Sequence, residues 1–538
     1  MERLTKRIIP IIALLSYFIA NLMTIMDFPT VHSDELWLKG ITDEMISQKS
    51  FAVTEPFFDL YPRVVHPFRW LYHSLEAAVF NILGSSAASS RILSLVAATL
   101  ALIVFYKILM HVLESRSLPI TGKVLPFTGK VLPFTGTLAL ALNIQFLYSA
   151  RFGRQDSMIL LLLLTAYGSA SGAILKSRRL HLILTFVTLL GIGVHPNSFL
   201  IGMTIAAILI VRILMKEAKL KDLISYVIMT AVGFAAYLVA GNLMNPGFLS
   251  GYLKFGESLG IEGNPIGRIE GFYWFWYKLY ARIGGTYDLL DIRIEIILMG
   301  AVILLIPVYA LVSRKKAGSN YHSLLIPWSA IIGMNLGLIV IGRYNQTSVV
   351  FFVPFIILAL FTAANIVLRN IGKRNLTWVF ALIILLSVPF RLYSGLTDYS
   401  EARPYKLGYE DMIEVVEGMV DDSDVVLGNL NTIEAFEGQR FYDIRNLAFL
   451  EANGITVEEY IQDRGITAIL IHEEMEYISN TSPAWDFLYG SNYLDDLFTY
   501  LDENTELINE FENPIYAMRI SRYSGTYPWK TRIYRVKP

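Results

Sequence analysis

Apolar residues gather in eleven stretches along this chain, and short polar segments separate them. A stretch of about 20 apolar residues crosses the hydrocarbon core of a membrane as a helix. Several of these stretches are shorter, so their boundaries are approximate. The pattern predicts an α-helical polytopic membrane protein with about 11 spans, at residues 8–26, 92–113, 131–150, 158–175, 180–194, 199–214, 223–243, 292–312, 324–341, 349–368 and 376–392.

Lysine and arginine residues occur in alternate loops between these stretches. Cationic side chains that flank a span are retained on the cytoplasmic side. An odd number of spans puts all the clusters on one side, so we expect a cytoplasmic N-terminus and an extracytoplasmic C-terminal domain at the plasma membrane. The clusters are Arg3, Lys6 and Arg7; Arg116, Lys123 and Lys130; Lys176, Arg178 and Arg179; Lys216, Lys219 and Lys221; Arg314, Lys315 and Lys316; and Arg369, Lys373 and Arg374.

Residues 66–83 form an apolar segment that we do not count as a span. The segment carries Arg69, His73 and Glu76 along its length, and a span here would invert every later loop. We expect an amphipathic helix in the outer membrane interface, with its aromatic residues in the headgroup layer. Such a helix would cover a site beside Asp34. The aromatic residues are Phe68, Trp70 and Tyr72.

The composition becomes polar and partly acidic after about residue 395, which divides the chain into a transmembrane part, 1–395, and a second domain, 396–538. A domain of this size can form its own core. We expect a soluble α/β domain with a helix at 409–419, buried strands at 425–430 and 468–471, and a late strand at 531–536. Thr456 and Glu459 form a capping box for a helix that ends near Gly465. The domain's sequence has no Gly-rich phosphate loop, so we expect it to recognise an acceptor or support the fold.

Composition and charge narrow the class of protein. Hydrophobic residues make up 54% of the 538 residues and charged residues only 17%, which sets the chain apart from soluble domains. The formal net charge of −1 gives no general affinity for nucleic acid, so we expect no nucleic acid partner. Because the chain has no cysteine, disulfides and thiolate chemistry are excluded.

Residues 272–277 read Phe-Tyr-Trp-Phe-Trp-Tyr and lie in a long outer loop, 244–291. Such rings are typical of the aromatic belt at a membrane surface. Aromatic planes can also stack on a sugar or grip a lipid chain. Both interpretations stay open.

Two segments at the outer ends of spans contain acidic residues. Asp34 and Glu35 follow the first span, where an uncompensated pair of carboxylates is costly unless function requires it. Arg151, Arg154 and Asp156 lie together between the third and fourth spans. The second segment can also be interpreted as an interfacial ion pair that neutralises itself. We favour one shared site on the outer side of the membrane.

Further candidates lie on the same side. His195 and Asn197 flank a proline in the turn between the fifth and sixth spans, where a histidine often serves only as a hydrogen-bonding partner. Arg343 and Tyr344 follow the ninth span. A guanidinium there can hold a lipid phosphate through paired hydrogen bonds, or it can simply extend to the membrane surface. His66 precedes the interfacial helix.

Together these segments resemble the GT-C superfamily of glycosyltransferases that depend on polyprenyl-phosphate sugars. The resemblance covers roughly the first 360 residues. It is strongest to family 39, which includes protein O-mannosyltransferases and the lipid A aminoarabinose transferase. The segments that carry it are His32-Ser33-Asp34-Glu35, His66-Pro67, Gly84 with Arg91, 149–156, His195-Pro196-Asn197, and Arg343-Tyr344 followed by Pro354.

The resemblance implies a role for each candidate residue. Asp34 would be the catalytic base, and Glu35 and Asp156 would be further catalytic carboxylates. Val65 stands where the aminoarabinose transferase has an acidic residue, which favours another sugar, such as the hexose mannose. The substrate-binding residues would be His66, Arg151, Arg154, His195, Asn197, Arg343 and Tyr344, with Arg343 on the lipid phosphate.

The expected chemistry agrees with the expected topology. Nucleotide sugars are made and kept in the cytosol, so a site on the outer side needs a sugar that is carried on a polyprenyl phosphate. A carboxylate within hydrogen-bond reach can accept the proton of the acceptor hydroxyl as that hydroxyl attacks the anomeric carbon. A single displacement inverts that carbon. Membrane lipid and a protein, lipid or glycan acceptor are the expected partners. We expect no cofactor, although the superfamily includes divalent-metal enzymes.

Two alternatives stay open. Oligosaccharyltransferases of the same superfamily use a divalent metal, and residues 484–490, Ala-Trp-Asp-Phe-Leu-Tyr-Gly, are similar to their Trp-Trp-Asp-Tyr-Gly segment. One Trp is replaced and a Leu is inserted, so we interpret this match as chance. The other alternative is a transporter or lipid-binding protein. Its polar residues would lie in the middle of spans, whereas here they gather at the outer edge.

Overall fold

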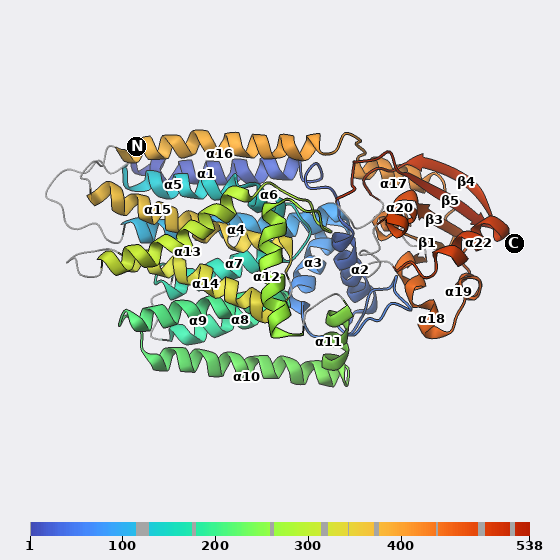
Figure 1. Cartoon of the computed structure of the whole chain (residues 1–538), viewed down its shortest axis with the longest axis horizontal. Helices are drawn as coiled ribbons and strands as arrows, with labels where there is room; N and C mark the ends of the chain where they lie inside the picture. Colours follow the sequence, from blue (N-terminus) through green and yellow to red (C-terminus); the bar gives the residue numbers. More distant parts are fainter. Residues whose placement is uncertain are drawn as a thin grey trace.

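A bundle of long helices and a smaller α/β domain at one end of it make up the protein, as a computed structural model describes it (Figure 1). The structure describes residues 2–114, 128–174, 179–258, 263–313, 321–342, 344–370, 376–436, 440–481, 490–516 and 522–538. The N-terminus lies at the end of the bundle opposite the α/β domain. Which end faces the cytoplasm stays a prediction.

Seven helices within the described ranges are long and apolar enough to cross a membrane. The chain is therefore an integral membrane protein. Three shorter apolar helices occupy further predicted spans: α1 (Glu2–Met23), α7 (Asp156–Ala170) and α8 (Leu180–Val194). The long helices are α4 (Ala87–Glu114), α9 (Phe199–Leu214), α10 (Leu220–Met244), α13 (Arg293–Ser313), α14 (His322–Ile341), α15 (Val353–Asn370) and α16 (Leu376–Glu401).

The remaining predicted span, residues 131–150, is not one straight helix. It consists of α5 (Thr128–Ala141) and α6 (Ile144–Ala150), which meet at an angle of 65°. Asn143 causes the break because its side chain accepts the backbone N–H groups of Gln145 and Phe146 and so begins a new helix.

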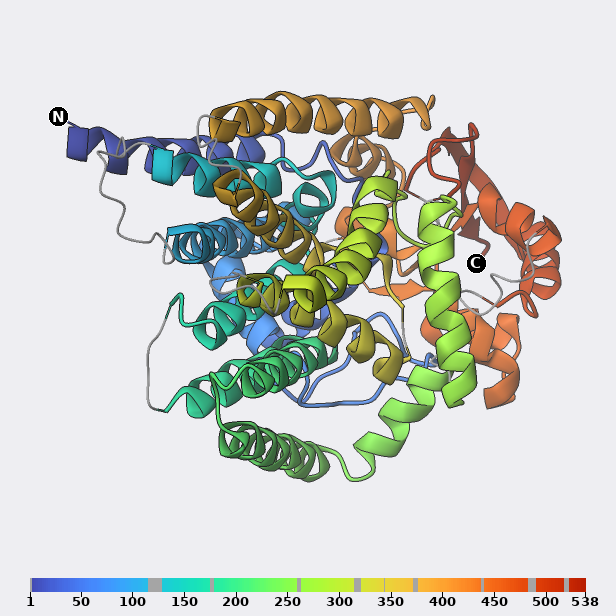
Figure 2. The same cartoon turned by 60° about the vertical axis from the view of Figure 1, so that its left-hand side comes forward.

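Helices α10 and α16 lie on opposite edges of the bundle (Figure 2). Only 6% of the most apolar window of each helix is buried by protein, whereas 72% is buried for residues 346–368 in the centre. An apolar helix that no protein covers faces lipid in a membrane protein. These two helices therefore mark the lipid-facing surface.

Short helices cover the end of the bundle that carries the α/β domain. They are α2 (Ser33–Gln48), α3 (Trp70–Leu83), α11 (Phe248–Ser258) and α12 (Pro265–Tyr280). Helix α12 contains the aromatic run, crosses the direction of the bundle in Figure 1 and exposes Tyr273, Trp274 and Tyr277. Both features agree with an aromatic belt.

Helix α3 is present where the sequence predicts an interfacial helix, but one expectation about it is wrong. Phe68 and Tyr72 are buried in protein contacts and do not face a headgroup layer, and only Trp70 among the three aromatic residues is exposed. The reason is that α3 packs against α2, α4 and α8, so its aromatic face is an internal surface.

The C-terminal domain contains a five-stranded mixed sheet with strand order β2-β1-β3-β5-β4. Strands β1 (Val426–Gly428), β2 (Phe441–Asp443) and β3 (Ala468–His472) are parallel. Strand β5 (Lys530–Val536) is antiparallel to β3 and to β4 (Thr505–Glu512). The α-helices that the structure describes in this domain are α17 (Tyr409–Glu417), α18 (Leu450–Asn453), α19 (Val457–Arg464), α20 (Glu473–Thr481) and α22 (Leu494–Asn504).

The α/β class of this domain, its three predicted strands and the capping box of α19 are confirmed. Strands β2 and β4 were not predicted, because β2 is very short and β4 is largely exposed. Helix α16 continues past the predicted boundary at residue 395 and ends at Glu401.

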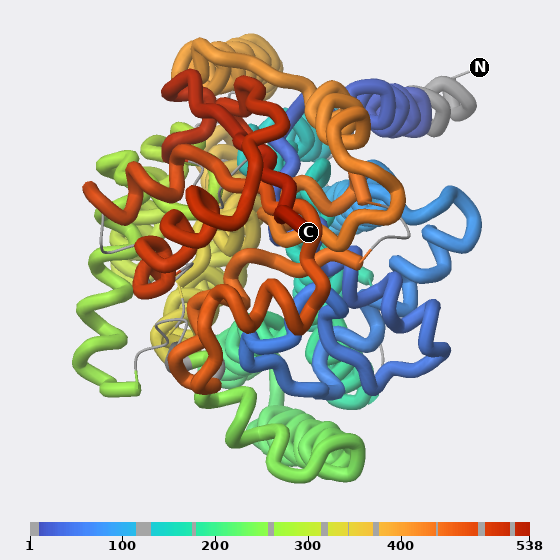
Figure 3. Tube along the Cα trace, turned by 90° about the vertical axis from the view of Figure 1, so that its right-hand side faces the viewer, coloured from blue at the N-terminus to red at the C-terminus, as the bar shows by residue number. Residues whose placement is uncertain are grey.

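The domain is docked on the loop that follows α2. Asn446 accepts the backbone N–H groups of residues 59–61 and donates to the carbonyl of Phe57. Arg464 forms an ion pair with Asp59 at 2.5 Å. Figure 3 shows the orange and red domain against the blue segment that contains α2 and α3. These contacts fix the end of the bundle where the candidate site lies.

Candidate active site

Helix α2 begins with the acidic pair that the sequence singles out. His32 caps the helix: its Nδ1 accepts the N–H of Asp34, and its own N–H donates to the Glu35 carboxylate. The partial positive charge of a helix N-terminus stabilises carboxylates placed there. Local sequence is therefore enough to hold both acids at the start of α2.

Glu35 is part of a buried ion pair. Its carboxylate accepts two hydrogen bonds from Arg91 of α4, at 2.7 and 2.8 Å, and one from the N–H of Gly153 at 2.7 Å. Neither Glu35 nor Arg91 has any exposed surface. Arg91 also donates to the carbonyls of Ile25 and Pro29. This arrangement joins four separate segments and saturates the Glu35 oxygens.

Asp34 lies in a second cluster that contains Arg154 and Asp156. The Arg154 guanidinium donates to the Asp34 carboxylate at 2.9 Å and lies 3.6 Å from the Asp156 carboxylate. Asp156 begins α7, and Arg154 belongs to the turn before it. The structure therefore brings together three of the predicted site residues, with one guanidinium between two carboxylates.

Three residues that the sequence did not single out complete this cluster. The Tyr287 hydroxyl donates to Asp34 at 2.5 Å and also accepts from Arg154. Thr347 donates to Asp156 at 3.0 Å, and Asn345 accepts the N–H of Thr347. The loop 281–292 and residues 345–347 are polar segments next to long apolar spans, and functional residues are often found in such segments.

The loop that carries Tyr287 is tied to the beginning of the C-terminal domain. Asp288 forms a buried ion pair with Arg403, and Arg282 forms an ion pair with Asp398 near the end of α16. Tyr399 donates to Asp288 at 3.2 Å. As a result Asp34 is only 8% exposed, and the cluster is covered by protein.

Arg151 lies away from the Asp34 cluster. It is 6% exposed, and its Nε and Nη2 have no hydrogen-bond partner among the residues that the structure describes. Burial, together with the nearby charge of Arg91, lowers the pKa of Arg151 to about 10. Tyr17 of α1 and Asp27 are its other electrostatic neighbours. Arg151 therefore does not belong to the Asp34 cluster, although it is close to Arg154 in the sequence.

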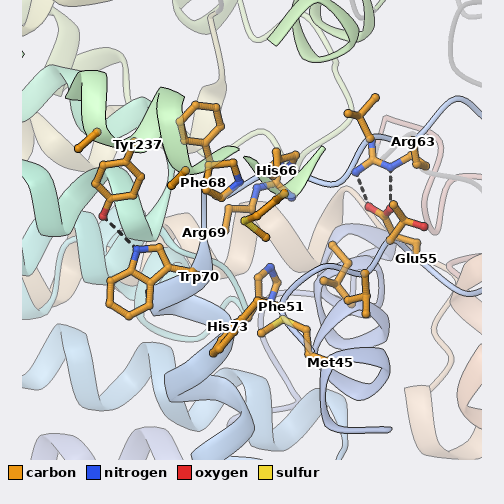
Figure 4. Close-up of a pocket in the computed structure, with 18 of the residues that line it drawn as sticks. Met45, Phe51, Glu55, Arg63, His66, Phe68, Arg69, Trp70, His73 and Tyr237 are labelled. Carbon is orange, nitrogen blue, oxygen red and sulfur yellow. Dashed lines mark hydrogen bonds and ion pairs between the residues drawn. The ribbon is translucent and has the colours of Figure 1, made fainter. Parts of the chain in front are cut away.

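His66 lines a cavity of about 590 Å³ between α2, α3, α8 and α10. The cavity walls are mostly apolar, with Met45, Phe68, Trp70 and Tyr237 among them (Figure 4). Arg63 and Arg69 also line it. Asp34 does not line this cavity. Helix α3 lies between the cavity and the Asp34 cluster: His73 of α3 lines the cavity, while the Tyr72 hydroxyl donates to the carbonyl of Gly153 at 3.2 Å.

The fold changes the pKa of two titratable groups that line the cavity, Glu55 and His66. Burial raises the pKa of Glu55, but the neighbouring Arg63 outweighs burial and holds it at about 2, so Glu55 and Arg63 form a stable ion pair. Burial, assisted by Arg69, lowers the pKa of His66 to about 3. The His66 Nδ1 atom is buried without a hydrogen-bond partner in the described ranges.

The other predicted residues lie elsewhere or outside the described residues. His195 Nδ1 accepts the N–H of Asn197 at 3.0 Å and so caps the 3₁₀ helix Pro196–Ser198 between α8 and α9. The Tyr344 hydroxyl donates to the carbonyl of Arg268, and its ring stacks on Phe275. Arg343 and residues 482–489, which contain the Trp-Asp segment, are outside the described ranges.

Solved structures with a similar overall fold include two from Archaeoglobus fulgidus. Its oligosaccharyltransferase in the apo form matches with a TM-score of 0.53 and 13% identity, over 93% of this chain and 73% of that chain. AglB, solved with an inhibitory peptide and a dolichol-phosphate, matches with a TM-score of 0.51 and 12% identity, over 92% of this chain and 72% of that chain. The protein has the GT-C fold. The fold expected from the sequence resemblance is thereby confirmed.

ArnT from Cupriavidus metallidurans in the apo state is also similar, with a TM-score of 0.45 and 12% identity, over 88% of this chain and 94% of that chain. No protein-family model matches the sequence, and no curated protein matches it. The fold is therefore recognised from the structure and not from a sequence match.

Proposed function

We propose that the protein transfers a sugar from a polyprenyl-phosphate donor to an acceptor hydroxyl. The observation that carries this proposal is the cluster of Asp34, Arg154 and Asp156, in which one guanidinium contacts two carboxylates from distant segments of a GT-C fold. Carboxylates beside a developing positive sugar ring and a cation beside a departing phosphate are what glycosyl transfer needs. The dolichol-phosphate bound in AglB supports a lipid-linked donor.

Asp34 acts as the general base in this proposal. The acceptor hydroxyl loses its proton to the Asp34 carboxylate as its oxygen forms a bond to the anomeric carbon. The bond between that carbon and the phosphate oxygen breaks in the same step, the electron pair leaves with the phosphate, and the configuration inverts. The Tyr287 hydroxyl now occupies the position on Asp34 that the acceptor hydroxyl would take.

Arg154 and Asp156 place one positive and one negative charge beside Asp34. Arg154 is close enough to both carboxylates to fix their separation, and Asp156 keeps its negative charge near the reacting sugar. Glu35 has all its oxygens engaged by Arg91, Gly153 and His32, so we assign it to positioning and not to catalysis. This modifies the role that the family resemblance implies for Glu35.

The donor lipid fits the cavity beside α3. Its walls of apolar residues from α10, a lipid-facing helix, suit an isoprenoid chain, and Arg63, His66 and Arg69 suit a phosphate. Helix α3 is the shared wall between this cavity and the 151–156 segment. Because the anomeric carbon is bonded to the phosphate oxygen, both must lie at the edge of α3 for an acceptor hydroxyl on Asp34 to reach that carbon.

The side chains around Asp34 do not form a set of ligands for a divalent metal. The Arg154 guanidinium occupies the space between the Asp34 and Asp156 carboxylates, where a bridging cation would bind. Within the described residues no group of three or more His, Asp or Glu side chains is arranged for a metal. We therefore propose that transfer proceeds without a metal, and that a chelator leaves the rate unchanged.

A transfer assay tests the proposal. The purified protein in nanodiscs receives a radiolabelled mannosyl-phosphoryl polyprenol, as a hexose donor, and native membranes as the source of protein, lipid and glycan acceptors. Asp34→Asn should lower product formation by at least about 100-fold, because the base is lost. Asp43→Asn, on the same helix, should leave the rate unchanged. Transfer at the normal rate by Asp34→Asn, or solute uptake without transfer, would overturn the assignment.

A further inference from the structure

The loop that connects α12 to α13 covers Asp34. Its Tyr287 is buried and donates to the Asp34 carboxylate at 2.5 Å. The Tyr287 ring stacks on His32, with 4.9 Å between the ring centroids, and Phe152 packs edge-on against it at 6.1 Å. The Arg154 guanidinium lies 5.0 Å from the centre of the same ring. Three neighbours therefore enclose the ring, and the backbone of the loop has to move before Tyr287 can leave Asp34.

The residue after Tyr287 is Asp288, and it holds the backbone of the loop in place. Its buried carboxylate forms an ion pair with Arg403, which follows α16 at the start of the C-terminal domain. The carboxylate also accepts hydrogen bonds from the hydroxyls of Tyr399, at 3.2 Å, and Thr30, at 3.4 Å. Separating a buried ion pair is costly because each charge loses its partner. The loop therefore stays over the site as long as Arg403 holds Asp288.

One turn of the C-terminal domain contacts both the loop and Arg403. Gly284 lies so close to this turn that a Cβ atom on Gly284 would be 2.7 Å from the Arg522 side chain. Gly525, three residues later, lies against Arg403, where a Cβ atom on the glycine would be 2.8 Å away. Between them, Tyr523 is buried in the core of the domain. The C-terminal domain therefore holds the loop at two points, directly at Gly284 and through Arg403.

A cover over the carboxylate has a use in glycosyl transfer. Water can attack the anomeric carbon in place of an acceptor, and a closed site that excludes water prevents this loss of the donor. The cover also has to open, because the acceptor hydroxyl needs the place that the Tyr287 hydroxyl occupies on Asp34. One cycle of transfer therefore requires both a closed and an open position of the loop.

We propose that the loop 281–292 is a lid over Asp34 and that the C-terminal domain holds it closed. Arg403 holds the lid through Asp288, and Arg522 packs against the beginning of the lid. The inference rests on the proposed function in one respect, namely that an acceptor hydroxyl takes the place of the lid on Asp34. Arg403 and Arg522 are positioning residues, because they act on the site only through the lid.

A disulfide between the lid and the C-terminal domain tests the proposal. The chain has no cysteine, so the pair Gly284→Cys with Arg522→Cys can form one intramolecular bond and no other. The two Cβ atoms start 2.7 Å apart, and a small shift brings them to the roughly 3.8 Å of a disulfide. Oxidised protein should transfer the hexose at least about 5-fold more slowly than protein treated with dithiothreitol, because the lid cannot open. Normal transfer by fully cross-linked protein would overturn the proposal.

The single-cysteine variants are the controls. Gly284→Cys alone and Arg522→Cys alone cannot cross-link within the chain, so oxidation should leave their transfer rates unchanged. Mass spectrometry after proteolysis measures the fraction of cross-linked protein, and recovery of transfer with dithiothreitol shows that the double variant is folded. Failure of the pair to cross-link would contradict the packing of Arg522 on the lid.

Hydrogen exchange measures the lid without any sugar transfer. In full-length protein in nanodiscs, the backbone amides of residues 284–288 should exchange about 10-fold faster in Arg403→Gln than in the wild type, because the ion pair with Asp288 is lost. Arg532→Gln, in a pair with Glu473 elsewhere in the domain, should leave this exchange unchanged. Equal exchange in Arg403→Gln and the wild type, or equally faster exchange throughout α2, would rule out a lid held by Arg403.

The lid and the catalytic assignment can fail separately. If Asp34→Asn transferred sugar normally while exchange of the loop depended on Arg403, the catalytic role of Asp34 would fail and the lid would stand. If transfer depended on Asp34 but the cross-linked protein transferred sugar normally, the lid would fail and the catalytic role would stand.

Discussion

Asp34 and Glu35 are neighbours in sequence, yet the structure places them in two different environments. Glu35 is saturated by Arg91 and backbone N–H groups in a site with no exposed surface. Asp34 shares Arg154 with a second carboxylate and accepts a hydrogen bond from the hydroxyl of a buried loop residue, Tyr287. Successive helical residues point about 100° apart, so one acid can tie segments together while the other faces a reaction site.

The strongest test of this comparison is the removal of Arg91. Arg91→Met should leave Glu35 buried without its cation and lower the free energy of unfolding by about 3–5 kcal/mol. Replacing both residues, Arg91→Met with Glu35→Met, should recover much of the loss because no buried charge remains. Thermal unfolding of each variant in detergent measures this. Equal stability of Arg91→Met and the wild type would contradict a structural role for Glu35.

Arg154→Lys tests the Asp34 side of the comparison. An ammonium group keeps the charge, but it cannot reach two carboxylates with the planar geometry of a guanidinium. Transfer should fall by about 10-fold to 100-fold, while stability changes less than in Arg91→Met. Arg293→Lys, in the exposed pair with Asp291, is the control and should behave as the wild type. A large loss of stability with normal transfer would reverse the two roles.

The buried ion pair of Glu55 with Arg63 allows a test by pH of how much such a pair stabilises the fold. The pKa of Glu55 is about 2 in the fold against 4.5 ordinarily, a difference of about 3 kcal/mol. Because the pKa is lowered by folding, this stability is present above about pH 4.5 and is lost as the pH falls toward 2. Melting temperatures at pH 5 and pH 3 should differ more for the wild type than for Glu55→Gln. Identical pH dependence would show that the pair contributes nothing.

Tyr287→Phe should have the smallest effect. It removes one hydrogen bond to Asp34 while Arg154 still contacts that carboxylate, so stability should fall by about 1–2 kcal/mol and transfer should change by less than about 10-fold. Tyr273→Phe, on the exposed face of α12, is the control for both stability and transfer. A loss of transfer as large as that of Asp34→Asn would make Tyr287 part of the catalytic machinery instead of a replaceable partner.

Local sequence accounts for much of the fold. Apolar runs form helices in a membrane because the backbone must satisfy its own hydrogen bonds there, and each predicted stretch is largely helical in the part that the structure describes. Thr456 with Glu459 and Asn143 mark helix starts through contacts only two or three residues away. Asn143 could have shown the bend between α5 and α6, since it interrupts an apolar run with a residue that caps helices.

The sequence alone therefore determined the membrane class, most helices and strands, and the acids at the start of α2, because these depend on periodicity and on neighbours along the chain. Only the tertiary structure decided that Arg91 pairs with Glu35, 56 residues away, and that Arg154 pairs with Asp34, 120 residues away. It also separated Arg151 from that cluster and brought Tyr287 into it. A hydrogen bond between distant segments depends on the direction of each side chain after packing, and that direction is set by the helices around it rather than by the residues beside it.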